Sequence, residues 1–385
     1  MDLKIPPTDL QKITRLLEIL QKNGHEGYLV GGCVRDLLMG KEPKDYDFAV
    51  SAKPEEVESL YKSTNPIGKA FGTIQVVLEN HAYELTTFRK DFTSSNNRHP
   101  DGVVFGSMQE DALRRDFTMN ALYYDPLKQE IHDFYNGQQD IQNNIIRFIG
   151  KPSERIYEDR LRVLRAFRFQ AQLGFDFAEE TAAALMAAAK DLHHLSWERI
   201  HREVEKTIVA PYFLHTGEDF IISGIIQHLY GEQNAPVMRA LKACYAKSTS
   251  HEYLYTIFLA FHALDAAKDY RLSKTTKNCV QKIRNFFSTK QDVYSLRRDF
   301  SNDLGTTLFY FATEMGKTSL VRIFEQAFSG LPHEYELAPP LLTAKDFPHL
   351  KGKNLGDALD RAYRLQIEQE IKTKDRLLSA LESPS

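Results

Sequence analysis

The spacing of apolar residues changes near residue 150, and this change constrains the fold more than any other feature of the sequence. Before it, short segments rich in β-branched and aromatic residues are separated by turn residues, a pattern typical of strands. These segments are residues 28–30, 45–50, 73–78, 83–88 and 102–105. We therefore predict that the first 150 residues form a mixed β-sheet with helices.

After Lys151-Pro152, apolar residues recur at the three- and four-residue spacing of helices that bury one face. This spacing covers residues 156–173, 179–190 and 196–209, and it continues in further segments to about residue 381. The two patterns together predict an α+β protein, in which a mixed sheet with helices is followed by a long all-α part.

Two local features precede the other predicted strands. Residues 8–22 have the spacing of an amphipathic helix, with Thr8 as its predicted N-cap and Gln11 at the capping-box position. Further on, the strand at residues 28–30 is followed by Gly31-Gly32 and then by apolar residues at helical spacing. This order indicates a strand, a tight glycine turn and a helix.

Length, composition and charge limit the classes of protein to consider. A chain of 385 residues has room for two to four domains of about 100 to 200 residues. No stretch approaches the roughly 18 uninterrupted apolar residues of a membrane span, and the N-terminus lacks the apolar core of a signal peptide, so we expect a cytoplasmic protein without a membrane partner. The net charge of −3 means that nucleic-acid binding would need a local basic patch.

Cysteine usage points to neither a disulfide framework nor a structural zinc site. Cys33, Cys244 and Cys279 are odd in number and far apart, and none forms a Cys-X-X-Cys or Cys/His pair at zinc spacing. Any metal site must therefore be built from other ligands.

Two aspartates are separated by one residue in Lys44-Asp45-Tyr46-Asp47. On a strand, Asp45 and Asp47 would project from the same face, with Tyr46 on the other. Two neighbouring carboxylates repel each other at neutral pH unless a cation lies between them, and Mg²⁺ prefers oxygen ligands. The pair predicts a Mg²⁺ site, although Asp-X-Asp alone is more often an exposed strand face or turn.

The glycine turn lies thirteen residues before Asp45. Glycine permits close approach of the backbone, the start of a helix offers free N–H groups to phosphate, and Arg35 adds a cation one turn further on. Gly32 and Arg35 are therefore predicted to bind the phosphates of a nucleotide beside the metal. A glycine turn taken alone usually does no more than end a strand.

The segment GGCVRDLLMGKEPKDYDFAV, from Gly31 to Val50, resembles the first signature of the class II tRNA nucleotidyltransferase and bacterial poly(A) polymerase family, a branch of the DNA polymerase β superfamily. Further segments resemble the family's later signatures in the same order. They are residues 114–121, 133–140, 158–162 with Arg165 and Arg168, and 198–203. A match to five motifs in order is not expected by chance.

The resemblance implies a domain order. A catalytic nucleotidyltransferase head would occupy residues 1–150, a nucleotide-selecting helical neck residues 151–210, and a tRNA-binding helical body and tail residues 211–385. The third signature would link head and neck, and the fifth would support the selecting helix. Residues 342–378 loosely resemble the family's tail, and no His and Asp run indicates the additional hydrolase domain of some members.

Four polar residues, Asp159, Arg162, Arg165 and Arg168, recur every three positions in the predicted helix at residues 156–173. By spacing alone they would form a solvated stripe whose ion pairs contribute roughly a few tenths of a kcal/mol each. Cytosine and adenine, however, both present an amino donor beside a ring-nitrogen acceptor, which an Asp acceptor beside an Arg donor complements. Uracil and guanine would leave both side chains unsatisfied.

The resemblance implies this template role for Asp159 and Arg162, and it places Arg165 and Arg168 in the nucleotide pocket. It also implies that Arg115 binds phosphate, where spacing alone would make it a cation on a helix surface. Glu84, on the strand at residues 83–88, is either a third carboxylate near the metals or an exposed strand residue.

A basic segment between residues 271 and 300 is the candidate contact for tRNA. Aromatic residues are interleaved with its charges, and the same pattern also fits a merely solvated surface. Its eight basic and two acidic residues are Arg271, Lys274, Lys277, Lys282, Arg284, Lys290, Arg297 and Arg298 with Asp292 and Asp299.

The predicted reaction is attack of an RNA 3′-hydroxyl on the α-phosphate of CTP or ATP, with release of pyrophosphate and with Mg²⁺ on Asp45 and Asp47. Within the family, the chain could add all of CCA, only CC, only A, or a poly(A) tail. Residues 88–100, FRKDFTSSNNRHP, have the length of the flexible loop of CCA- and A-adding enzymes, which argues against CC-only addition.

The remaining alternatives have less support. The strongly basic C-terminal extension of the poly(A) enzymes is not seen. A non-catalytic RNA-binding module gains nothing from two clustered carboxylates that repel phosphate. The sequence therefore predicts a CCA-adding enzyme with tRNA, CTP and ATP as partners, and it indicates no protein partner.

Overall fold

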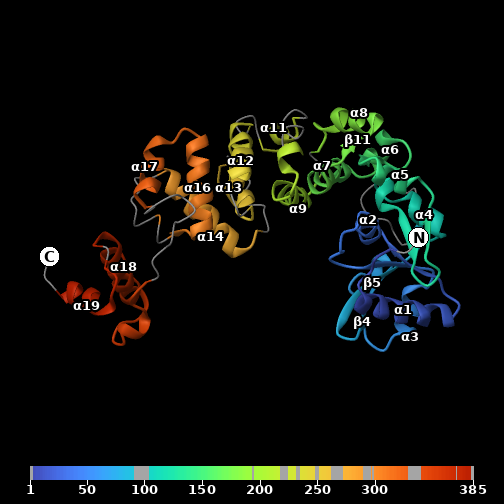
Figure 1. Cartoon of the computed structure of the whole chain (residues 1–385), viewed down its shortest axis with the longest axis horizontal. Coiled ribbons are helices and arrows are strands. Elements are labelled where there is room, and N and C mark those ends of the chain that lie inside the picture. Colours follow the sequence, from blue (N-terminus) through green and yellow to red (C-terminus); the bar gives the residue numbers. More distant parts are fainter. Residues whose placement is uncertain are drawn as a thin grey trace. The chain divides into compact units, whose positions relative to one another are not determined.

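The computed structural model of the chain is drawn in Figure 1. It describes residues 3–90, 104–192, 195–216, 224–230, 235–247, 251–261, 272–288, 296, 299–327, 340–369 and 371–382. The chain forms two compact units, Met1–Ile225 and Ile226–Ser385. The sheet and the helices that follow it directly in the sequence belong to the first unit.

A seven-stranded mixed sheet, in the order β3-β4-β5-β2-β1-β8-β9, is the core of the first unit. Within it β2 and β5 are parallel and the other neighbours are antiparallel. Its strands are β1 Gly27–Val30, β2 Asp47–Val50, β3 Thr64–Asn65, β4 Thr73–Leu78, β5 His81–Thr87, β8 Leu122–Asp125 and β9 Glu130–Asp133. Two short pairs stand apart from it, β6 Arg89–Lys90 with β7 Val104–Phe105 and β10 Ile145–Ile146 with β11 Asp176–Phe177.

Helices and short 3-10 turns surround this sheet and continue beyond it. The helices of the first unit are α1 Pro7–Lys22, α2 Gly32–Leu38, α3 Pro54–Leu60, α4 Met108–Leu113, α5 Gly137–Gln142, α6 Pro152–Glu158, α7 Leu161–Leu173, α8 Glu179–Ala188 and α9 Trp197–Ile208. The 3-10 turns are η1 Lys69–Phe71 and η2 Thr118–Asn120, and α11 Ile225–Tyr230 lies at the border of the two units. In the described residues beyond 150, β11 is the one strand, so the predicted α+β fold is confirmed.

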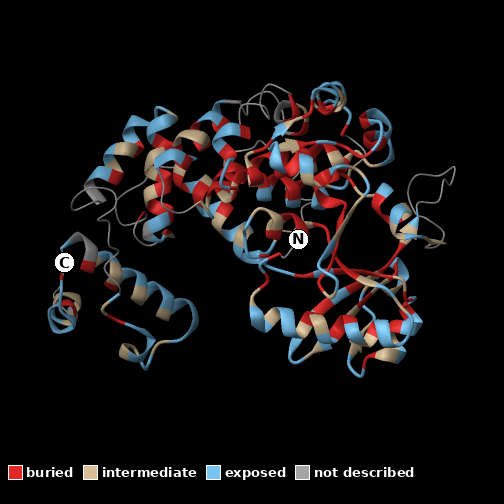
Figure 2. Cartoon of the chain, turned by 45° about the vertical axis from the view of Figure 1, so that its right-hand side comes forward, coloured by how far each residue is buried: buried red, intermediate tan, exposed pale blue. Residues whose placement is uncertain are grey.

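One face of the sheet is covered by α1 and α3. A Cβ at Gly27 of β1 would lie 2.8 Å from the side chains of both Leu17 and Leu20, so glycine allows α1 to approach this closely. The hydroxyl of Tyr61, at the end of α3, donates to the Leu16 carbonyl of α1 at 2.8 Å. Figure 2 shows that these helices are buried toward the strands and exposed on their outer sides.

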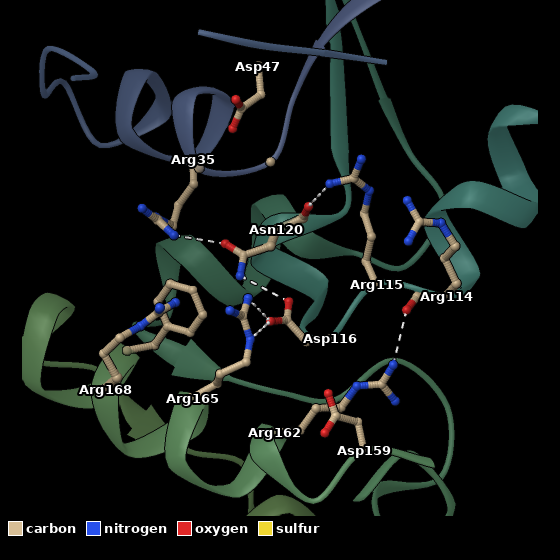
Figure 3. A pocket seen from close by; sticks show the side chains of 13 residues that line it. Arg35, Asp47, Arg114, Arg115, Asp116, Asn120, Asp159, Arg162, Arg165 and Arg168 are labelled. Atoms are coloured by element: carbon tan, nitrogen blue, oxygen red, sulfur yellow. Dashed lines mark hydrogen bonds and ion pairs between the residues drawn. The ribbon is translucent and has the colours of Figure 1, made fainter. Parts of the chain in front are cut away.

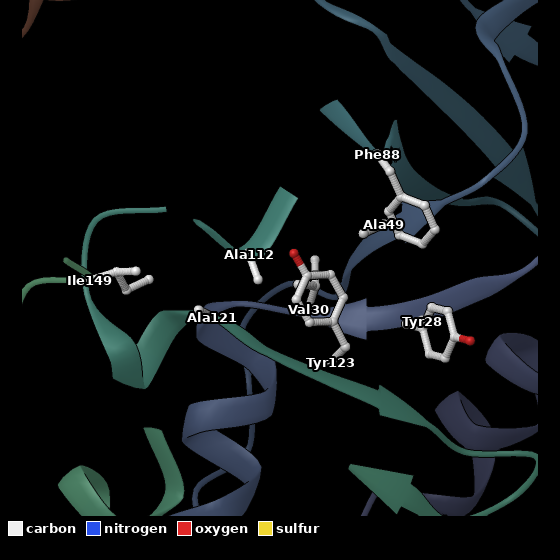
Figure 4. Close-up of a cluster of buried hydrophobic side chains, with 8 residues drawn as sticks. All are labelled: Tyr28, Val30, Ala49, Phe88, Ala112, Ala121, Tyr123 and Ile149. Atoms are coloured by element: carbon white, nitrogen blue, oxygen red, sulfur yellow. The ribbon is translucent and has the colours of Figure 1, made fainter. Parts of the chain in front are cut away.

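The opposite face carries a buried cluster of aromatic and aliphatic side chains (Figure 4). Its members are Tyr28, Val30, Ala49, Phe88, Ala112, Ala121, Tyr123 and Ile149. Because side chains alternate along a strand, Asp47 projects from the same face of β2 as Ala49. The α2 helix contacts β1 and β8, and Asp47 lies beside it in Figure 3.

Three predicted boundaries were wrong in instructive ways. The first helix begins at Pro7 with Pro6 as its N-cap, and not with Thr8, because a proline in the first turn lacks an N–H that would have no partner there. Strand β2 begins at Asp47, so Asp45 lies in the bend before it and not on the strand.

The third correction concerns the predicted helix at residues 156–173, which is two helices. Asp159 separates α6 from α7 with an extended backbone, φ −146° and ψ 105°. Its side-chain Oδ1 accepts a hydrogen bond from the Leu161 N–H at 3.0 Å. Aspartate competes with the helical backbone in this way, which ends one helix and begins the next. Asp159 therefore stands at a joint and does not belong to a continuous polar stripe.

The second unit is helical in the residues that are described. Its helices after α11 are α12 Ala235–Lys247, α13 Leu254–Phe261, α14 Lys274–Ser288, α16 Asn302–Glu314, α17 Thr318–Ala327, α18 Gly352–Glu368 and α19 Lys374–Glu382, with η6 Ala344–Asp346. A cluster of Leu342, Ala362, Ile371 and Leu377 holds α18 and α19 together. No helix in the described part of the chain is both long and apolar enough to cross a bilayer.

Candidate active site

A cavity of about 490 Å³ in the first unit gathers most of the predicted site residues (Figure 3). This volume is in the range of roughly 300 to 1,000 Å³ that is usual for small-molecule pockets. Six arginines and three aspartates give the lining a positive excess that suits an anionic ligand. The lining residues are Gly31, Gly32, Arg35, Asp47, Arg114, Arg115, Asp116, Asn120, Asp159, Arg162, Arg165, Arg168 and Phe169.

Eight of the nine predicted site residues line this cavity, and Asp45 is the exception. Asp45 lies on a second cavity of about 400 Å³, which shares Gly32, Arg35 and Asp47 with the first. The two cavities therefore adjoin at Asp47. We call their shared side, with Asp45, Asp47 and Glu84, the carboxylate end of the site.

The glycine turn shapes the cavity wall between β1 and α2. Gly31 has φ +77°, a backbone conformation that L side chains rarely adopt. A Cβ at this position would also lie 3.3 Å from Nη1 of Arg115. One turn into α2, the buried Arg35 donates to Asn120 Oδ1 at 2.8 Å and to Asp36 Oδ1 at 2.7 Å. The turn therefore leaves room for two arginines beside the backbone.

The carboxylate end combines Asp47 and Glu84 from two neighbouring strands with Asp45 from the bend before β2. Asp47 on β2 is the register partner of Glu84 on the parallel strand β5, so both side chains leave the same face. Although the Asp47 side chain keeps solvent-exposed surface, the protein around it at the cavity wall raises its pKa above the usual range, and the charges of Glu84 and Asp45 raise it further. Among the residues that the structure describes, neither Asp45 nor Asp47 has a basic partner within ion-pair distance. Such a donor set fits a divalent cation, which would relieve this repulsion.

Glu84 adds charge to this end but does not complete a ligand group. The described residues contain no cluster of three or more His, Cys, Asp or Glu side chains that could hold a metal ion together. Two carboxylates can still suffice, since Mg²⁺ in nucleotide sites is usually held by one or two carboxylates together with substrate phosphates.

Arg115 and Arg114 line the cavity at the end of α4 and share a buried aspartate. Arg115 Nη2 donates to Asp111 Oδ2 at 3.1 Å, and Arg114 Nε donates to Asp111 Oδ1 at 2.8 Å. The Tyr123 hydroxyl donates to Asp111 Oδ2 at 2.6 Å and accepts from Arg115 Nε at 3.1 Å. Burial opposes ionisation of Asp111, but Arg115 and Arg114 outweigh it and lower its pKa. The guanidinium of Arg115 is thus fixed in one orientation.

Arg165 of α7 is held by Asp116. Its Nε and Nη2 donate to Asp116 Oδ2 at 2.8 and 2.5 Å. Asp116 also accepts hydrogen bonds at Oδ1 from the Phe117 N–H at 2.8 Å and from Asn120 Nδ2 at 3.2 Å. Burial works against the charge, yet Arg165 and these donors lower the pKa of Asp116. This ion pair links residues 114–121, the segment that resembles the second signature, to α7.

Asp159 and Arg162 stand next to each other at the joint between α6 and α7 (Figure 3). Asp159 Oδ2 accepts from Arg199 Nη2 of α9 at 2.7 Å. Arg162 Nη1 donates to Glu158 Oε2 at 2.6 Å and to the Arg155 carbonyl at 2.8 Å. An acceptor and a donor therefore lie side by side, each with its orientation set by protein partners.

Arg168 and Phe169 complete the wall of the cavity on α7. Arg168 forms a buried ion pair with Glu203 of α9 at 3.1 Å. Burial and repulsion from Arg165 lower the pKa of Arg168. The guanidinium carbons of Arg168, Arg35 and Arg165 lie 4.3, 5.4 and 5.5 Å from the centroid of the Phe169 ring. One aromatic side chain thus separates three cations at the edge of the pocket.

Comparisons with known proteins show the family to which the chain belongs. The family model described as "Poly A polymerase head domain" matches residues 27–147, and the one described as "Probable RNA and SrmB- binding site of polymerase A" matches residues 174–235. The chain is 32% identical to a CCA-adding enzyme of Staphylococcus epidermidis, over 94% of this chain and 95% of that protein. The chain belongs to the tRNA nucleotidyltransferase and poly(A) polymerase family.

Other members of this family are similar to part of the chain in sequence, or to nearly all of it in structure. The chain is 47% identical to a CCA-adding enzyme of Staphylococcus aureus over 192 residues, which are 50% of this chain and 48% of that protein. The crystal structure of the Bacillus stearothermophilus CCA-adding enzyme in complex with CTP superposes with a TM-score of 0.72 and 25% identity, over 98% of each chain. These matches confirm the resemblance found in the sequence. The chain is a nucleotidyltransferase, and this family generally uses a divalent metal ion.

Sequence reasoning missed five residues that line the pocket of this nucleotidyltransferase. They are Gly31, Arg114, Asp116, Asn120 and Phe169. Three of them lie in the segment that resembles the family's second signature, from which Arg115 alone had been taken. That motif was the available signal, but the ion pairs that direct its side chains become visible only in the fold.

Two other predicted features, the basic segment at residues 271–300 and the loop at residues 88–100, are described only in part by the structure. In the basic segment, Arg284 donates to the Ala260 and Leu259 carbonyls at 3.0 Å each, and Lys282 lies 3.7 Å from Asp299. Arg284 therefore caps the end of α13, and Lys274, Lys277 and Lys282 are the exposed cations in the described part of this segment. The other five charges of the segment, and residues 91–100 of the predicted flexible loop, lie outside the described residues.

Proposed function

We propose that this nucleotidyltransferase adds CCA to the 3′ ends of tRNA, with CTP and ATP as substrates and pyrophosphate as product. The observation that carries the proposal is the cavity in which a glycine turn, a carboxylate strand and the Asp159–Arg162 pair meet. The CCA-adding relative that is aligned over nearly the whole chain supports the same activity. Because tRNA and nucleoside triphosphates are cytoplasmic, the proposal includes a cytoplasmic location.

The carboxylate end is the proposed place of chemistry. Asp45 and Asp47 would hold Mg²⁺, whose charge would favour attack of the 3′-hydroxyl on the α-phosphate and departure of pyrophosphate. The exposed position of both carboxylates leaves their oxygens available for ligation. Desolvation raises the pKa of Asp47, and repulsion from Glu84 and Asp45 raises it further; a bound cation would relieve this repulsion.

The arginines would bind and orient the triphosphate. Arg35 and Arg115 approach the glycine turn from opposite sides, and each is fixed by hydrogen bonds to other side chains of the head. Preformed guanidinium forks bind phosphate oxygens without losing further conformational freedom. Gly32, next to Asp47 on the cavity wall, would let the phosphates approach the backbone beside the metal.

The choice of base is assigned to Asp159 and Arg162. Their acceptor and donor complement the shared pattern of cytosine and adenine, and both keep hydrogen-bonding capacity beyond their protein partners. Arg165 and Arg168 are proposed to line the nucleotide pocket behind this pair. Uracil or guanine would leave buried groups unpaired, which costs roughly 1 to 3 kcal/mol for each group.

One experiment distinguishes the activities possible in the family. Three tRNAs, ending before CCA, after C and after CC, are incubated with CTP alone, ATP alone or both. Complete CCA addition predicts two added cytidines on the first tRNA with CTP, one adenosine on the third with ATP, and full repair of all three with both.

Other patterns would identify other enzymes. Activity restricted to the third tRNA with ATP would indicate A-only addition, and arrest after CC would indicate CC-only addition. A long adenosine tail independent of the starting end would indicate a poly(A) polymerase. No incorporation by a folded, tRNA-binding protein would indicate a non-catalytic RNA-binding module.

The base-selection assignment has a test of its own. Arg162→Ala should accept UTP and GTP more readily relative to CTP and ATP, because the donor that meets the ring-nitrogen acceptor is gone. Single-nucleotide kcat/KM values for the four triphosphates measure this ratio. Rejection of UTP and GTP as strong as in the parent would remove Arg162 from the template.

A further inference from the structure

Arg155 of α6 lies behind the pocket and contacts the two residues that end α4. Its Nη2 donates to the carbonyl oxygens of Arg114 and Arg115, at 2.7 and 2.8 Å. Arg155 is buried, with 7% of its surface exposed, and it is not among the residues that line the cavity. A single guanidinium nitrogen thus fixes the backbone of two pocket arginines from outside the pocket.

The same guanidinium also reaches the base-selecting pair. Its Nη1 forms an ion pair with Glu158, whose Oε2 accepts from Arg162 Nη1 at 2.6 Å. Arg162 in turn donates through Nη1 to the Arg155 carbonyl at 2.8 Å and through Nη2 to the Arg114 carbonyl at 3.3 Å, the latter drawn in Figure 3. Arg155, Glu158 and Arg162 therefore form one network that ends on the backbone of Arg114 and Arg115.

We infer that Arg155 is a positioning residue that holds the base-selecting Arg162 and the phosphate-side Arg115 at a fixed separation. This inference rests on the proposed function, in which these two arginines contact opposite ends of one nucleotide. Arg155 itself touches neither the nucleotide cavity nor the carboxylate end. It acts through the Arg115 backbone on one side and through Glu158 on the other.

A fixed separation matters because the base and the triphosphate belong to one rigidly bound molecule. If the phosphates are anchored first, discrimination at the base depends on Arg162 standing where the ring nitrogen of cytosine or adenine arrives. If Arg162 moves, the binding of CTP and ATP is weakened most, because their bases accept a hydrogen bond from it. The bases of UTP and GTP pair poorly with this donor in either position. Loss of Arg155 should therefore slow the reaction. It should also narrow selectivity, the ratio of kcat/KM for CTP and ATP to that for UTP and GTP.

The test compares Arg155→Lys with Arg160→Lys. Lysine keeps the charge but has one nitrogen, which cannot reach both carbonyls and Glu158 together. Arg160 is a matched control from the same joint, because its ion pair with Asp191 at 2.7 Å lies outside the network. For each protein, kcat/KM is measured for CTP, ATP, UTP and GTP on tRNA lacking CCA, together with tRNA affinity and the melting temperature.

For Arg155→Lys we expect kcat/KM for CTP and ATP to fall about ten- to hundredfold, as for loss of one or two charge-assisted hydrogen bonds. The values for UTP and GTP should fall less, so that selectivity narrows by about tenfold or more. Arg160→Lys should stay within about threefold of the parent for all four nucleotides. In the Arg162→Ala background, Arg155→Lys should narrow selectivity no further.

Equal losses for all four nucleotides, or unchanged selectivity, would overturn the inference, because a merely structural residue lowers every rate alike. Selectivity is a ratio measured on one preparation, so a lower fraction of folded enzyme does not change it. If Arg155→Lys yields no folded protein, Arg155→Gln replaces it, since a neutral amide leaves no unpaired charge in a buried site. Failure of the proposed function would look different, because the parent itself would then not use CTP or ATP.

Discussion

The two ends of the pocket handle charge in opposite ways. At the carboxylate end, Asp45 and Asp47 are exposed, Glu84 lies beside Asp47 on the neighbouring strand, and among the described residues neither aspartate has a cationic partner within ion-pair distance. Along α7, by contrast, Arg165 is paired with Asp116 and Arg168 with Glu203. We call this second side, with Arg162, Arg165 and Arg168 of α7, the arginine end.

This difference indicates which kind of ligand each end binds. Like charges without partners raise the free energy of the empty carboxylate end, and a bound cation removes that cost. Partnered arginines are held in position before the ligand arrives, so they orient an anion without rearrangement. Substitutions at the first end should therefore change activity more than stability, whereas substitutions that break pairs at the second should change stability as well.

The largest effect is expected from Asp45→Asn and Asp47→Asn. Each should lower incorporation of CMP and AMP by about a thousandfold or more, since metal catalysis contributes several kcal/mol to the barrier. The melting temperature should stay the same or rise, because a repelled carboxylate is removed. Single-turnover assays with tRNA lacking CCA measure the rate.

Glu84→Gln is the matched control for these two variants, as it neutralises the register partner of Asp47 on the neighbouring strand. Its rate should remain within about tenfold of the parent, since the remaining two carboxylates can hold the metal. Turnover retained in Asp45→Asn or Asp47→Asn would remove that residue from the metal site.

Asp116→Asn breaks a pair behind the arginine end and should cost stability. The free energy of unfolding should fall by about 2 kcal/mol, less than for a fully buried pair because Arg165 is partly exposed. Urea denaturation of the parent and the variant measures the difference. Asp45→Asn serves as control and should change it by less than about 0.5 kcal/mol. Equal stability of the parent and Asp116→Asn would contradict the pairing described here.

His201 of α9, packed behind α7, links stability to pH. Burial lowers its pKa to about 4, so the folded protein holds the neutral ring while the unfolded chain takes up a proton near pH 6.5. The free energy of unfolding is therefore not reduced by this residue above pH 6.5. It falls as the pH decreases from 6.5 toward 4, because only the unfolded chain binds the proton in this range. Between pH 7 and pH 5 the loss should be about 2 kcal/mol.

Urea denaturation at pH 7 and pH 5 tests this linkage, with His201→Gln as the comparison. The variant should lose about 2 kcal/mol less than the parent over the same interval, because it has no ring to protonate. Parallel losses in both proteins would show that His201 does not titrate as the burial implies.

The smallest effect on stability is expected for Arg199→Gln. Its ion pair with Asp159 is half exposed, and such pairs contribute about 0 to 1 kcal/mol. Selectivity should respond more, since Arg199 orients the acceptor of the template pair. Thermal melting and the CTP to UTP ratio of kcat/KM separate the two effects. A melting temperature lowered as far as in Asp116→Asn would show that the exposed pair has a structural role.

The sequence predicted the sheet, and it made the residues of the candidate site visible, because both depend on local patterns and motifs. The β-branched and aromatic residues of β4 and β5, the glycine turn after β1 and the Asp-X-Asp that ends at the start of β2 are each contained in a few neighbouring residues. The α6–α7 joint was missed, since apolar spacing continues across Asp159 and does not record the hydrogen bond from its side chain to the Leu161 N–H. Periodicity reports which face is buried and not where a helix is interrupted.

The network around the site could not be predicted for a different reason. Asp116 meets Arg165 across 49 positions of sequence, and Arg155 meets the Arg114 carbonyl across 41. Such partners are brought together by the packing of α6 and α7 against the end of α4, which no local pattern encodes. For the same reason, Asn120 within the second signature and Phe169 within the predicted helix at residues 156–173 were not selected from the sequence.

The central claim, that the carboxylate end binds the metal and the arginine end does not, is tested most directly by Mn²⁺ binding. Electron paramagnetic resonance measures free Mn²⁺ as the ion is titrated into the parent, Asp47→Asn and Arg165→Lys in the absence of nucleotide. The account predicts that Asp47→Asn loses Mn²⁺ binding while Arg165→Lys retains the affinity of the parent. Equal affinity in the parent and Asp47→Asn would contradict it.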